Sequence, residues 1–214
     1  MREVLERRQL DLQVVLEDLT DPHNAAAIYR SAEAFGAGAM HLVYDRATWP
    51  SVNRAVAAHS HRWMPTERWF DPVICVSRLR ERGLTVLATA LREGAQDYRE
   101  VDFTRPTAVV FGQEKVGASA AMLAAVDGAI YVPMGGFVQS LNVSVSAGVV
   151  LSEALRQRHA AGATAPRWDA EREALMQSWI AREEQRPKAP AGARGPDAAW
   201  IDAAGSEEPE GEDP

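Results

Sequence analysis

The chain of 214 residues is long enough for one domain with a sizeable core and an appended segment. Its hydrophobic content of 46% and charged content of 25% are typical of a globular protein, and no apolar run has the length needed to cross a bilayer. The net charge of −7 rests mostly on five acids near the C-terminus, which are Glu207, Glu208, Glu210, Glu212 and Asp213. The rest of the chain carries a net charge of about −2, so a nucleic-acid partner is not excluded, because local patches decide phosphate binding.

The single cysteine, Cys75, excludes an intramolecular disulfide and fits a reducing cytosol. It lies in the apolar run 73–76, where we expect a buried structural thiol rather than a nucleophile. The N-terminal segment Met1–Arg8 has no apolar stretch of the kind that a secretory signal contains. We therefore expect a cytoplasmic protein.

Apolar runs typical of strands alternate with helical patterns along most of the chain. The expected strands are Gln13–Leu19, Ala39–Tyr44, Leu84–Ala90, Ala108–Phe111 and Ala129–Val132. The expected helices are Asn24–Phe35, Val52–Ala58, Asp71–Arg82, Ala118–Val126, Asn142–His159 and Trp168–Glu184. This alternation predicts an α/β fold with a mostly parallel sheet that helices cover on both faces.

Parallel sheets bind ligands beyond the carboxyl ends of their strands, so we expect a site in the segments after Ala90, Phe111 and Val132. The expected organisation is a domain over 1–160, a linker and C-terminal helix over 161–185, and an acidic, disordered tail rich in Pro, Gly and Ala over 186–214.

The first predicted helix begins near Asn24, and Arg30 follows six residues later. This spacing is nearly two helical turns, so we expect the two side chains on one face. The small neighbours Ala27 and Ala34 leave room for a large substrate beside the guanidinium. The alternative is a surface arginine on an amphipathic helix.

A second motif, Val109–Ser119, contains the pattern Gly112-x-Glu114-x-x-Gly117. It is not a Walker A phosphate loop, because no Gly-Lys-Ser/Thr sequence closes it. Gly112 allows close approach of the backbone, and Glu114 is suited to hold a ribose hydroxyl, a backbone turn or an arginine. The alternative is an ordinary strand-to-helix turn.

A third motif, Val132–Gly148, begins where a predicted strand ends at a proline. Gly135 and Gly136 allow the backbone to approach a bound group closely, and we expect Asn142 to cap the helix that follows. Small residues on that helix let another element pack closely against it, and they are Ser144, Ser146, Ala147 and Gly148. No metal is expected, because His59 and His61 have no accompanying cluster of Cys, His or acidic residues.

Together and in this order, the three motifs resemble the SpoU family of RNA ribose 2′-O-methyltransferases, within the SPOUT superfamily. They are Pro-His-Asn-x-x-x-Ile-x-Arg (Pro22–Arg30), Phe-Gly-Gln-Glu-Lys-x-Gly (Phe111–Gly117) and Val-Pro-Met-x-Gly-x-Val-Gln-Ser-Leu-Asn-Val-Ser-Val (Val132–Val145). Finer features resemble the members that methylate guanosine 18 of tRNA, and they lie in Glu6–Leu12, Ala88–Leu91, Asp102–Thr107 and Glu153–Arg158.

The resemblance implies that the C-terminal part of the α/β domain forms a deep trefoil knot, a rare exception to the usual threading rules. It implies that S-adenosylmethionine binds in the knot loops, in contact with Thr89, Ala90, Gly112, Val132, Met134, Gly135 and Leu141. If the methyl donor passes over Gly112, that residue must stay small. The family also implies a homodimer through the knot region, with active sites that draw on both chains.

Arg30 matches the family's catalytic arginine, which is proposed to help deprotonate the ribose 2′-hydroxyl. Because the pKa of a free guanidinium is above about 12, Arg30 is either a base activated by a substrate phosphate or a stabiliser of the alkoxide. We expect Asn24 and Glu114 to orient Arg30 and the ribose, and Ser140 and Asn142 to shape the loop.

Four arginines are the expected RNA phosphate contacts, and they are Arg7, Arg8, Arg156 and Arg158. The implied substrate is tRNA, at guanosine 18 of the D-loop. One alternative is a SpoU-type enzyme that acts on ribosomal RNA, whose members often carry an extra N-terminal RNA-binding domain. A second alternative, of a different class, is a non-catalytic RNA-binding or assembly factor.

Overall fold

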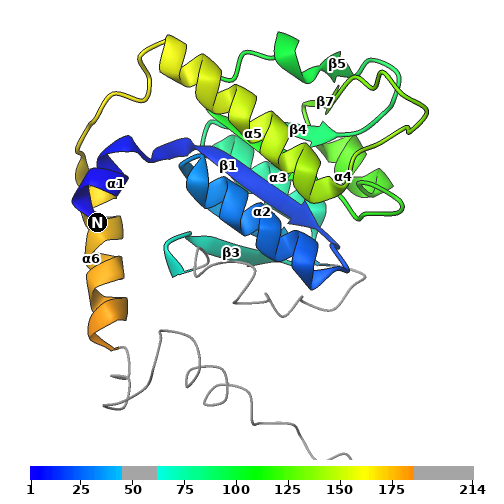
Figure 1. The fold of residues 1–214 in the computed structure, drawn as a ribbon. Coiled ribbons are helices and arrows are strands. Elements are labelled where there is room, and N and C mark those ends of the chain that lie inside the picture. The colour runs from blue at the N-terminus through cyan, green and yellow to red at the C-terminus, as the bar shows by residue number, and fades with distance from the viewer. Residues whose placement is uncertain (45–61, 186–214) are drawn as a thin grey trace, which may run out of the picture.

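The computed structural model describes residues 1–44 and 62–185, and at its centre lies a seven-stranded sheet (Figure 1). The strands are β1 (Gln9–Glu17), β2 (Ala37–Val43), β3 (Thr66–Trp69), β4 (Thr85–Thr89), β5 (Gln96–Asp97), β6 (Thr107–Phe111) and β7 (Gly128–Tyr131). Their order across the sheet is β3-β2-β1-β6-β4-β7-β5, and every neighbouring pair is parallel. The predicted α/β class with a mostly parallel sheet is confirmed.

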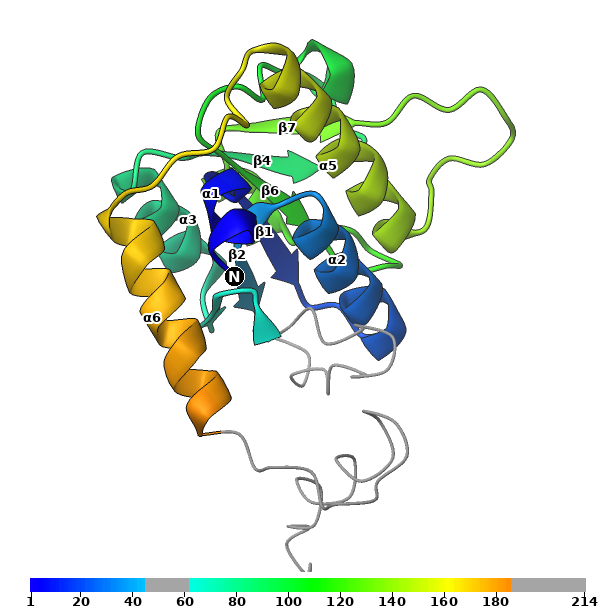
Figure 2. The ribbon, with the colours of Figure 1, turned by 60° about the vertical axis from the view of Figure 1, so that its left-hand side comes forward.

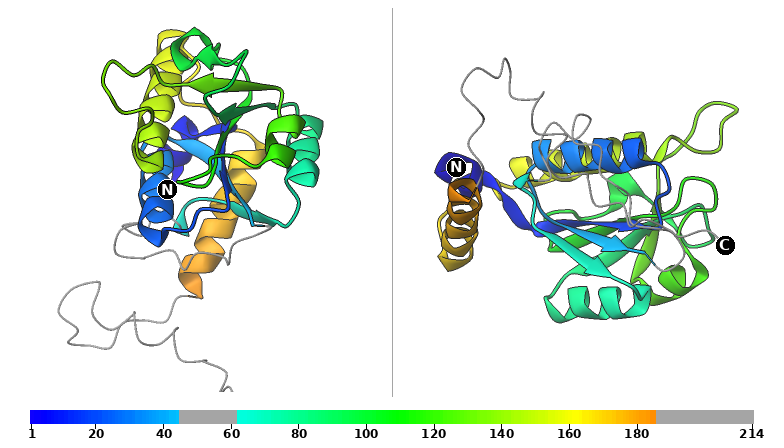
Figure 3. Two further views of the ribbon diagram at one scale, coloured as in Figure 1. Left: turned by 90° about the vertical axis from the view of Figure 1, so that its right-hand side faces the viewer. Right: turned by 90° about the horizontal axis from the view of Figure 1, so that it is seen from below.

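Helices cover both faces of this sheet, as the view along its edge shows (Figure 3). On one face α2 (Pro22–Ala34) packs against α5 (Val143–Ala160), and on the other α3 (Pro72–Glu81) packs against α4 (Ala120–Ala125). A short 3-10 helix, η2 (Tyr98–Glu100), follows β5. Because both faces are covered, β2 and β6 are buried along their whole length and consist mostly of apolar residues.

Two apolar cores lie on opposite sides of the sheet. Leu16 of β1 belongs to the core beneath α2 and α5, and its neighbour Val15 belongs to the core beneath α3 and α4. This division follows from the alternation of side chains along a strand. Cys75 of α3 is buried in the second core, and burial raises the pKa of its thiol to about 12. The predicted structural thiol is therefore confirmed.

Polar caps fix where the two helices next to the site begin. The Asp21 side chain accepts a hydrogen bond from the His23 N–H at 2.8 Å, and Pro22 is the first residue of α2. The Asn142 side chain accepts from the Ser144 N–H at 2.8 Å, so the predicted cap of α5 is confirmed. α2 ends before Gly36, whose φ of +74° favours glycine.

α1 (Arg2–Arg7) and α6 (Ala170–Glu184) lie side by side beyond one edge of the sheet (Figure 2). The buried Arg172 of α6 donates to the carbonyl oxygens of Leu5 at 3.0 Å and Arg8 at 2.7 Å. Trp179 of α6 is also buried, and the Arg8 guanidinium carbon lies 5.4 Å from the centre of its ring. The predicted C-terminal helix is therefore present, and it packs onto the N-terminal segment.

Four short elements were not predicted from the sequence, and they are α1, β3, β5 and η2. β1 begins at Gln9 rather than Gln13, with a shift in its register to β2 between these two residues. The predicted helix Val52–Ala58 and the predicted tail 186–214 lie outside the described residues. No helix within the described ranges is both long and apolar enough to span a membrane.

Candidate active site

A cavity of about 250 Å³ opens at the carboxyl edge of the sheet, beyond β4, β6 and β7. Six of the seven residues expected to contact the methyl donor line it, and they are Thr89, Ala90, Gly112, Val132, Met134 and Leu141. The seventh, Gly135, does not line the cavity. The location agrees with the rule that parallel sheets bind ligands beyond their carboxyl ends.

Sequence reasoning missed the wall of the cavity that α5 provides through Val143, Ser146 and Val150. These three residues lie at positions i, i+3 and i+7, so they share one face of the helix. That spacing was visible in the sequence and was the signal that could have identified them.

Glu114, in the loop after β6, holds the turn between β1 and α2. Its carboxylate accepts hydrogen bonds from the Thr20 N–H at 3.2 Å, the Thr20 hydroxyl at 3.1 Å and the Asp21 N–H at 3.1 Å. The Asn24 side-chain amide donates a further bond at 3.2 Å. Of the three partners that the sequence left open for Glu114, the structure shows the backbone turn.

The hydrogen bonds continue from Asn24 into the third motif. Asn142 donates from its amide nitrogen to the Asn24 side-chain oxygen at 3.0 Å, and its own oxygen caps α5 through Ser144. A continuous chain of hydrogen bonds thus joins Glu114, Asn24 and Asn142. The three sequence motifs, which are far apart along the chain, meet through these side chains.

The surroundings of Glu114 favour its ionised form. Partial burial by itself acts to raise the pKa of Glu114, but hydrogen bonds from its own backbone, from Thr20, from Asp21 and from Asn24 outweigh this effect. They hold the pKa below its usual value. A carboxylate that accepts hydrogen bonds can therefore connect the two loops at neutral pH.

Arg30 lies apart from this network. Its side chain is exposed on α2, whereas Asn24 is buried, and it forms no hydrogen bond or ion pair with any residue in the described ranges. The expectation that Asn24 and Arg30 share a face of α2 was wrong. Six residues are not a whole number of turns in a helix with 3.6 residues per turn, so the two side chains point in different directions around the helix axis. Within one chain, Asn24 and Glu114 bond to each other, Glu114 also accepts from the turn and Asn24 from Asn142, and neither bonds to Arg30. Ser140 is exposed and lines the cavity.

Gly112 is required by the packing of its own loop. A Cβ atom at this position would lie 2.2 Å from the Ala118 backbone nitrogen and 2.4 Å from the Gly117 carbonyl carbon. The loop therefore excludes any side chain there before a ligand is considered. By contrast, a Cβ at Gly135 or Gly136 would meet no atom within 4 Å.

Two of the four arginines expected to contact phosphate are structural. Arg8 is 2% exposed and donates to the Ala37 carbonyl at 2.9 Å. Arg158 is 1% exposed and donates to the carbonyl oxygens of Phe103 at 2.7 Å and Arg105 at 2.9 Å. The prediction for these two was wrong, because both guanidinium groups are buried inside the protein, where an RNA phosphate does not reach them.

The other two arginines, Arg7 and Arg156, are exposed. Each is paired with a glutamate of its own helix, Glu3 at 3.7 Å and Glu153 at 2.7 Å respectively. Exposed pairs of this kind are weak, so both arginines stay available to a phosphate.

Residues 11–152 match the SpoU rRNA methylase family, a span that includes all three motifs. The chain belongs to this family. Its resemblance to SpoU enzymes is therefore confirmed. The chain is 48% identical over 182 residues to a tRNA (guanosine(18)-2′-O)-methyltransferase of Thermus thermophilus, covering 84% of this chain and 93% of that protein.

Solved structures of the family have the same fold. A TrmH/SpoU tRNA modifying enzyme of Aquifex aeolicus superimposes with a TM-score of 0.80 and 35% identity, over 87% of this chain and 95% of that one. The SpoU methyltransferase AviRb of Streptomyces viridochromogenes, in complex with the cofactor AdoMet, gives a TM-score of 0.61 and 29% identity. That match covers 69% of this chain and 57% of AviRb.

Proposed function

We propose that this chain transfers a methyl group from S-adenosylmethionine to the 2′-hydroxyl of guanosine 18 in the D-loop of tRNA, in the cytoplasm. The observation that carries the proposal is the hydrogen-bonded chain of Glu114, Asn24 and Asn142 beside the cavity. It joins three motifs of a methyltransferase family into one site. The relative that matches over most of both lengths is named for this tRNA position.

The cavity suits the proposed methyl donor. Its walls combine apolar side chains, such as Met134 and Leu141, with polar ones, such as Gln139 and Ser140, and with the backbone at the ends of three parallel strands. Apolar surface with polar groups placed in it is typical of cofactor sites, because the polar groups fix the orientation of the ligand. When bound, S-adenosylmethionine supplies an electrophilic methyl group on a sulfonium. We assign its contacts to the seven residues predicted from the family, six of which line the cavity, while Gly135 follows the lining residue Met134 in the chain.

The protein's part in the chemistry is alignment of the ribose and removal of the hydroxyl proton. Alignment alone lowers the barrier of such a reaction by several kcal/mol. Arg30, which has no partner in the described part of the chain, is free to meet the 2′-oxygen or a neighbouring phosphate. There its positive charge stabilises the 2′-oxygen as the hydroxyl proton passes to a neighbouring RNA phosphate or to water. Ser140 lines the cavity.

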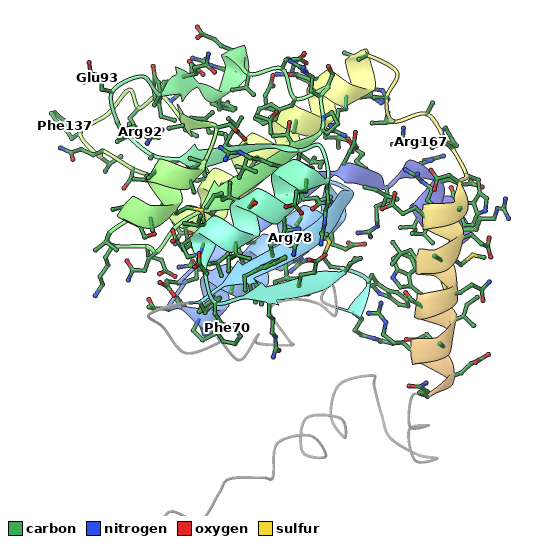
Figure 4. All side chains as sticks on the ribbon, turned by 180° about the vertical axis from the view of Figure 1, so that it is seen from behind. Phe70, Arg78, Arg92, Glu93, Phe137 and Arg167 are labelled. Atoms are coloured by element: carbon green, nitrogen blue, oxygen red, sulfur yellow. The ribbon has the colours of Figure 1, made fainter. Side chains whose placement is uncertain are left out.

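We further propose that the C-terminal part of the domain is knotted and that two chains form a dimer through this region. Exposed apolar side chains on the loop before α5 and on α5 itself support the dimer: Phe137, Val138 and Val145 are 108%, 63% and 49% exposed. Figure 4 shows Phe137 at the outer edge of the molecule. Because Arg30 does not line the cavity of its own chain, an active site that draws on both chains also accounts for its position.

Ribosomal RNA is the second candidate substrate, because the matched family is named for rRNA methylation. For either RNA, Arg7 and Arg156 remain the proposed phosphate contacts. A lower affinity at high salt for both RNAs is the expected sign of such contacts.

The test of the proposed function is the variant Arg30→Ala. We expect methyl transfer to tRNA to fall by at least about 100-fold, because a preorganised positive charge is lost at the reacting oxygen. Binding of S-adenosylmethionine, measured by calorimetry, should stay within twofold of the original protein. Arg78→Ala is the matched control, since Arg78 is exposed on α3 at the other face of the sheet (Figure 4). Loss of donor binding in Arg30→Ala would contradict the assigned role.

A further inference from the structure

Lys115 lies at the mouth of the cavity, and its side chain has no partner among the described residues. Among the described residues that line the cavity, it is the one with a positive charge. Its side chain is exposed and forms no hydrogen bond or ion pair with another described residue. Lysine is also rare here, since Lys115 and Lys188 are the two lysines in a sequence with 23 basic residues.

The loop that carries Lys115 is tightly fixed. The Gln113 side-chain oxygen accepts hydrogen bonds from the N–H groups of Lys115 and Val116, both at 2.8 Å. The Gly117 N–H donates to the Gln113 carbonyl at 2.8 Å, and Gly117 has a φ of +73°. Gly112 packs directly against the backbone of the same loop. Lys115 is thus a flexible side chain on a rigid support, which favours a binding role.

The neighbouring carboxylate does not neutralise this charge. Glu114 directs its carboxylate to the turn before α2, where Thr20, Asp21 and Asn24 occupy it. Two adjacent residues of opposite charge therefore point to different partners. The ammonium group is left for a ligand that carries negative charge and reaches the mouth of the cavity from solvent.

We propose that Lys115 binds the RNA phosphate next to the ribose that is methylated. The inference rests on the proposed function, because the phosphate enters with the RNA substrate. A lysine is a compact point charge on a long flexible stem, and it binds phosphate without a fixed direction of approach. Its place on an exposed loop fits an anion on a macromolecule outside the cavity better than a group enclosed within it.

The experiment compares the original protein with Lys115→Gln, Lys115→Arg and Arg105→Gln. Arg105 is exposed just before the amino end of β6, whereas Lys115 follows its carboxyl end, so the control removes one charge from the opposite edge of the sheet. Three quantities are measured: affinity for unmodified tRNA transcript over a range of salt concentrations, calorimetric affinity for S-adenosylmethionine, and the thermal unfolding midpoint.

We expect Lys115→Gln to weaken tRNA binding by about 3- to 10-fold and to reduce the slope of log K against log salt by about one. Lys115→Arg should restore both values, and Arg105→Gln should change neither. Donor affinity and the unfolding midpoint should be the same in all four proteins. Unchanged tRNA affinity and slope in Lys115→Gln would overturn the proposal, as would an equal effect in Arg105→Gln.

A fall in donor affinity with tRNA binding intact would also overturn it, and would assign the ammonium group to the carboxylate of the donor. Failure of the proposed function has a different signature. In that case the original protein itself transfers no methyl group to RNA, whatever Lys115 does to binding.

Discussion

The Glu114 carboxylate and the Asn24 amide are the side chains through which the loops of the site hold one another. Glu114 accepts from the Thr20–Asp21 turn and from Asn24, and Asn24 accepts from Asn142. Asn24 is buried and Glu114 is half-buried, so loss of either one leaves a polar group of the other without its partner. The polar residues of the motifs thus serve to shape the site as well as to meet substrate.

The two kinds of glycine in the site should respond differently to substitution. Gly112→Ala should lower the free energy of unfolding by about 3 kcal/mol, because the new Cβ would overlap the backbone at Gly117 and Ala118. Gly135→Ala, with no atom within 4 Å of the new methyl group, should change it by less than about 0.5 kcal/mol. Urea denaturation measures both, and equal effects of the two substitutions would contradict the packing assigned to Gly112.

At the scale of elements, sequence periodicity was sufficient for the long helices and the buried strands. α2, α5 and β6 lie where their patterns placed them, because a buried strand or an amphipathic helix has a regular apolar spacing. The short elements α1, β3 and β5 lack enough residues to show a period. The family motifs located the cavity, but its α5 wall was missed.

The sequence also did not reveal whether a charged side chain is buried or exposed. Arg8 and Arg158 have the same basic neighbours in sequence as Arg7 and Arg156, yet the first two are buried and the last two are exposed. The difference arises from the path of the chain, which places free carbonyl oxygens around Arg8 and Arg158. Such tertiary acceptors have no local sequence signature.

The attachment of α6 to α1 depends on Arg172. Arg172→Met should lower the free energy of unfolding by about 3 kcal/mol, because the carbonyl oxygens of Leu5 and Arg8 each lose one donor and Asp169 loses its cation. Arg156→Met is the matched control, since it removes an exposed pair within one helix and should cost less than about 0.5 kcal/mol. Chemical denaturation distinguishes them, and a small effect of Arg172→Met would show that α6 is held by other contacts.

His41 of β2 links three neighbouring strands. Its Nε2 lies 2.7 Å from the Gln13 side-chain oxygen of β1, and its Nδ1 accepts from the Trp69 indole N–H of β3 at 3.2 Å. With Nδ1 as acceptor, the ring is neutral and Nε2 donates to Gln13. Burial lowers the pKa of His41 to about 4, more than the nearby Glu67 raises it.

Acid should therefore destabilise the sheet through His41. The pKa of His41 is lower in the folded state than the value of about 6.5 expected in the unfolded state. Above pH 6.5 the ring is neutral in both states, and the free energy of unfolding keeps its full value. As the pH falls toward 4, the unfolded state binds a proton that the folded state does not, and the free energy of unfolding decreases. Between pH 7.5 and pH 5 the loss should be about 2 kcal/mol. In His41→Gln the pH dependence should shrink by that amount. Identical pH profiles for the original protein and His41→Gln would refute the burial effect.

At the scale of the whole molecule, the two edges of the sheet have different roles. The carboxyl edge holds the cavity, the hydrogen-bonded motif residues and the exposed Lys115. The opposite edge is closed by buried arginines that bind carbonyl oxygens and by α6. A stable amino edge and an open carboxyl edge are the usual division in parallel α/β proteins.

The most direct test of the central claim is transfer of labelled methyl from S-adenosylmethionine to unmodified tRNA transcript, with the modified nucleotide mapped. A transcript with 2′-deoxyguanosine at position 18 is the matched control, since it lacks only the proposed nucleophile, and ribosomal RNA is tested in parallel. The account predicts label on the 2′-oxygen of guanosine 18 and none in the deoxy transcript. Equal label in both transcripts, or label confined to ribosomal RNA, would contradict it.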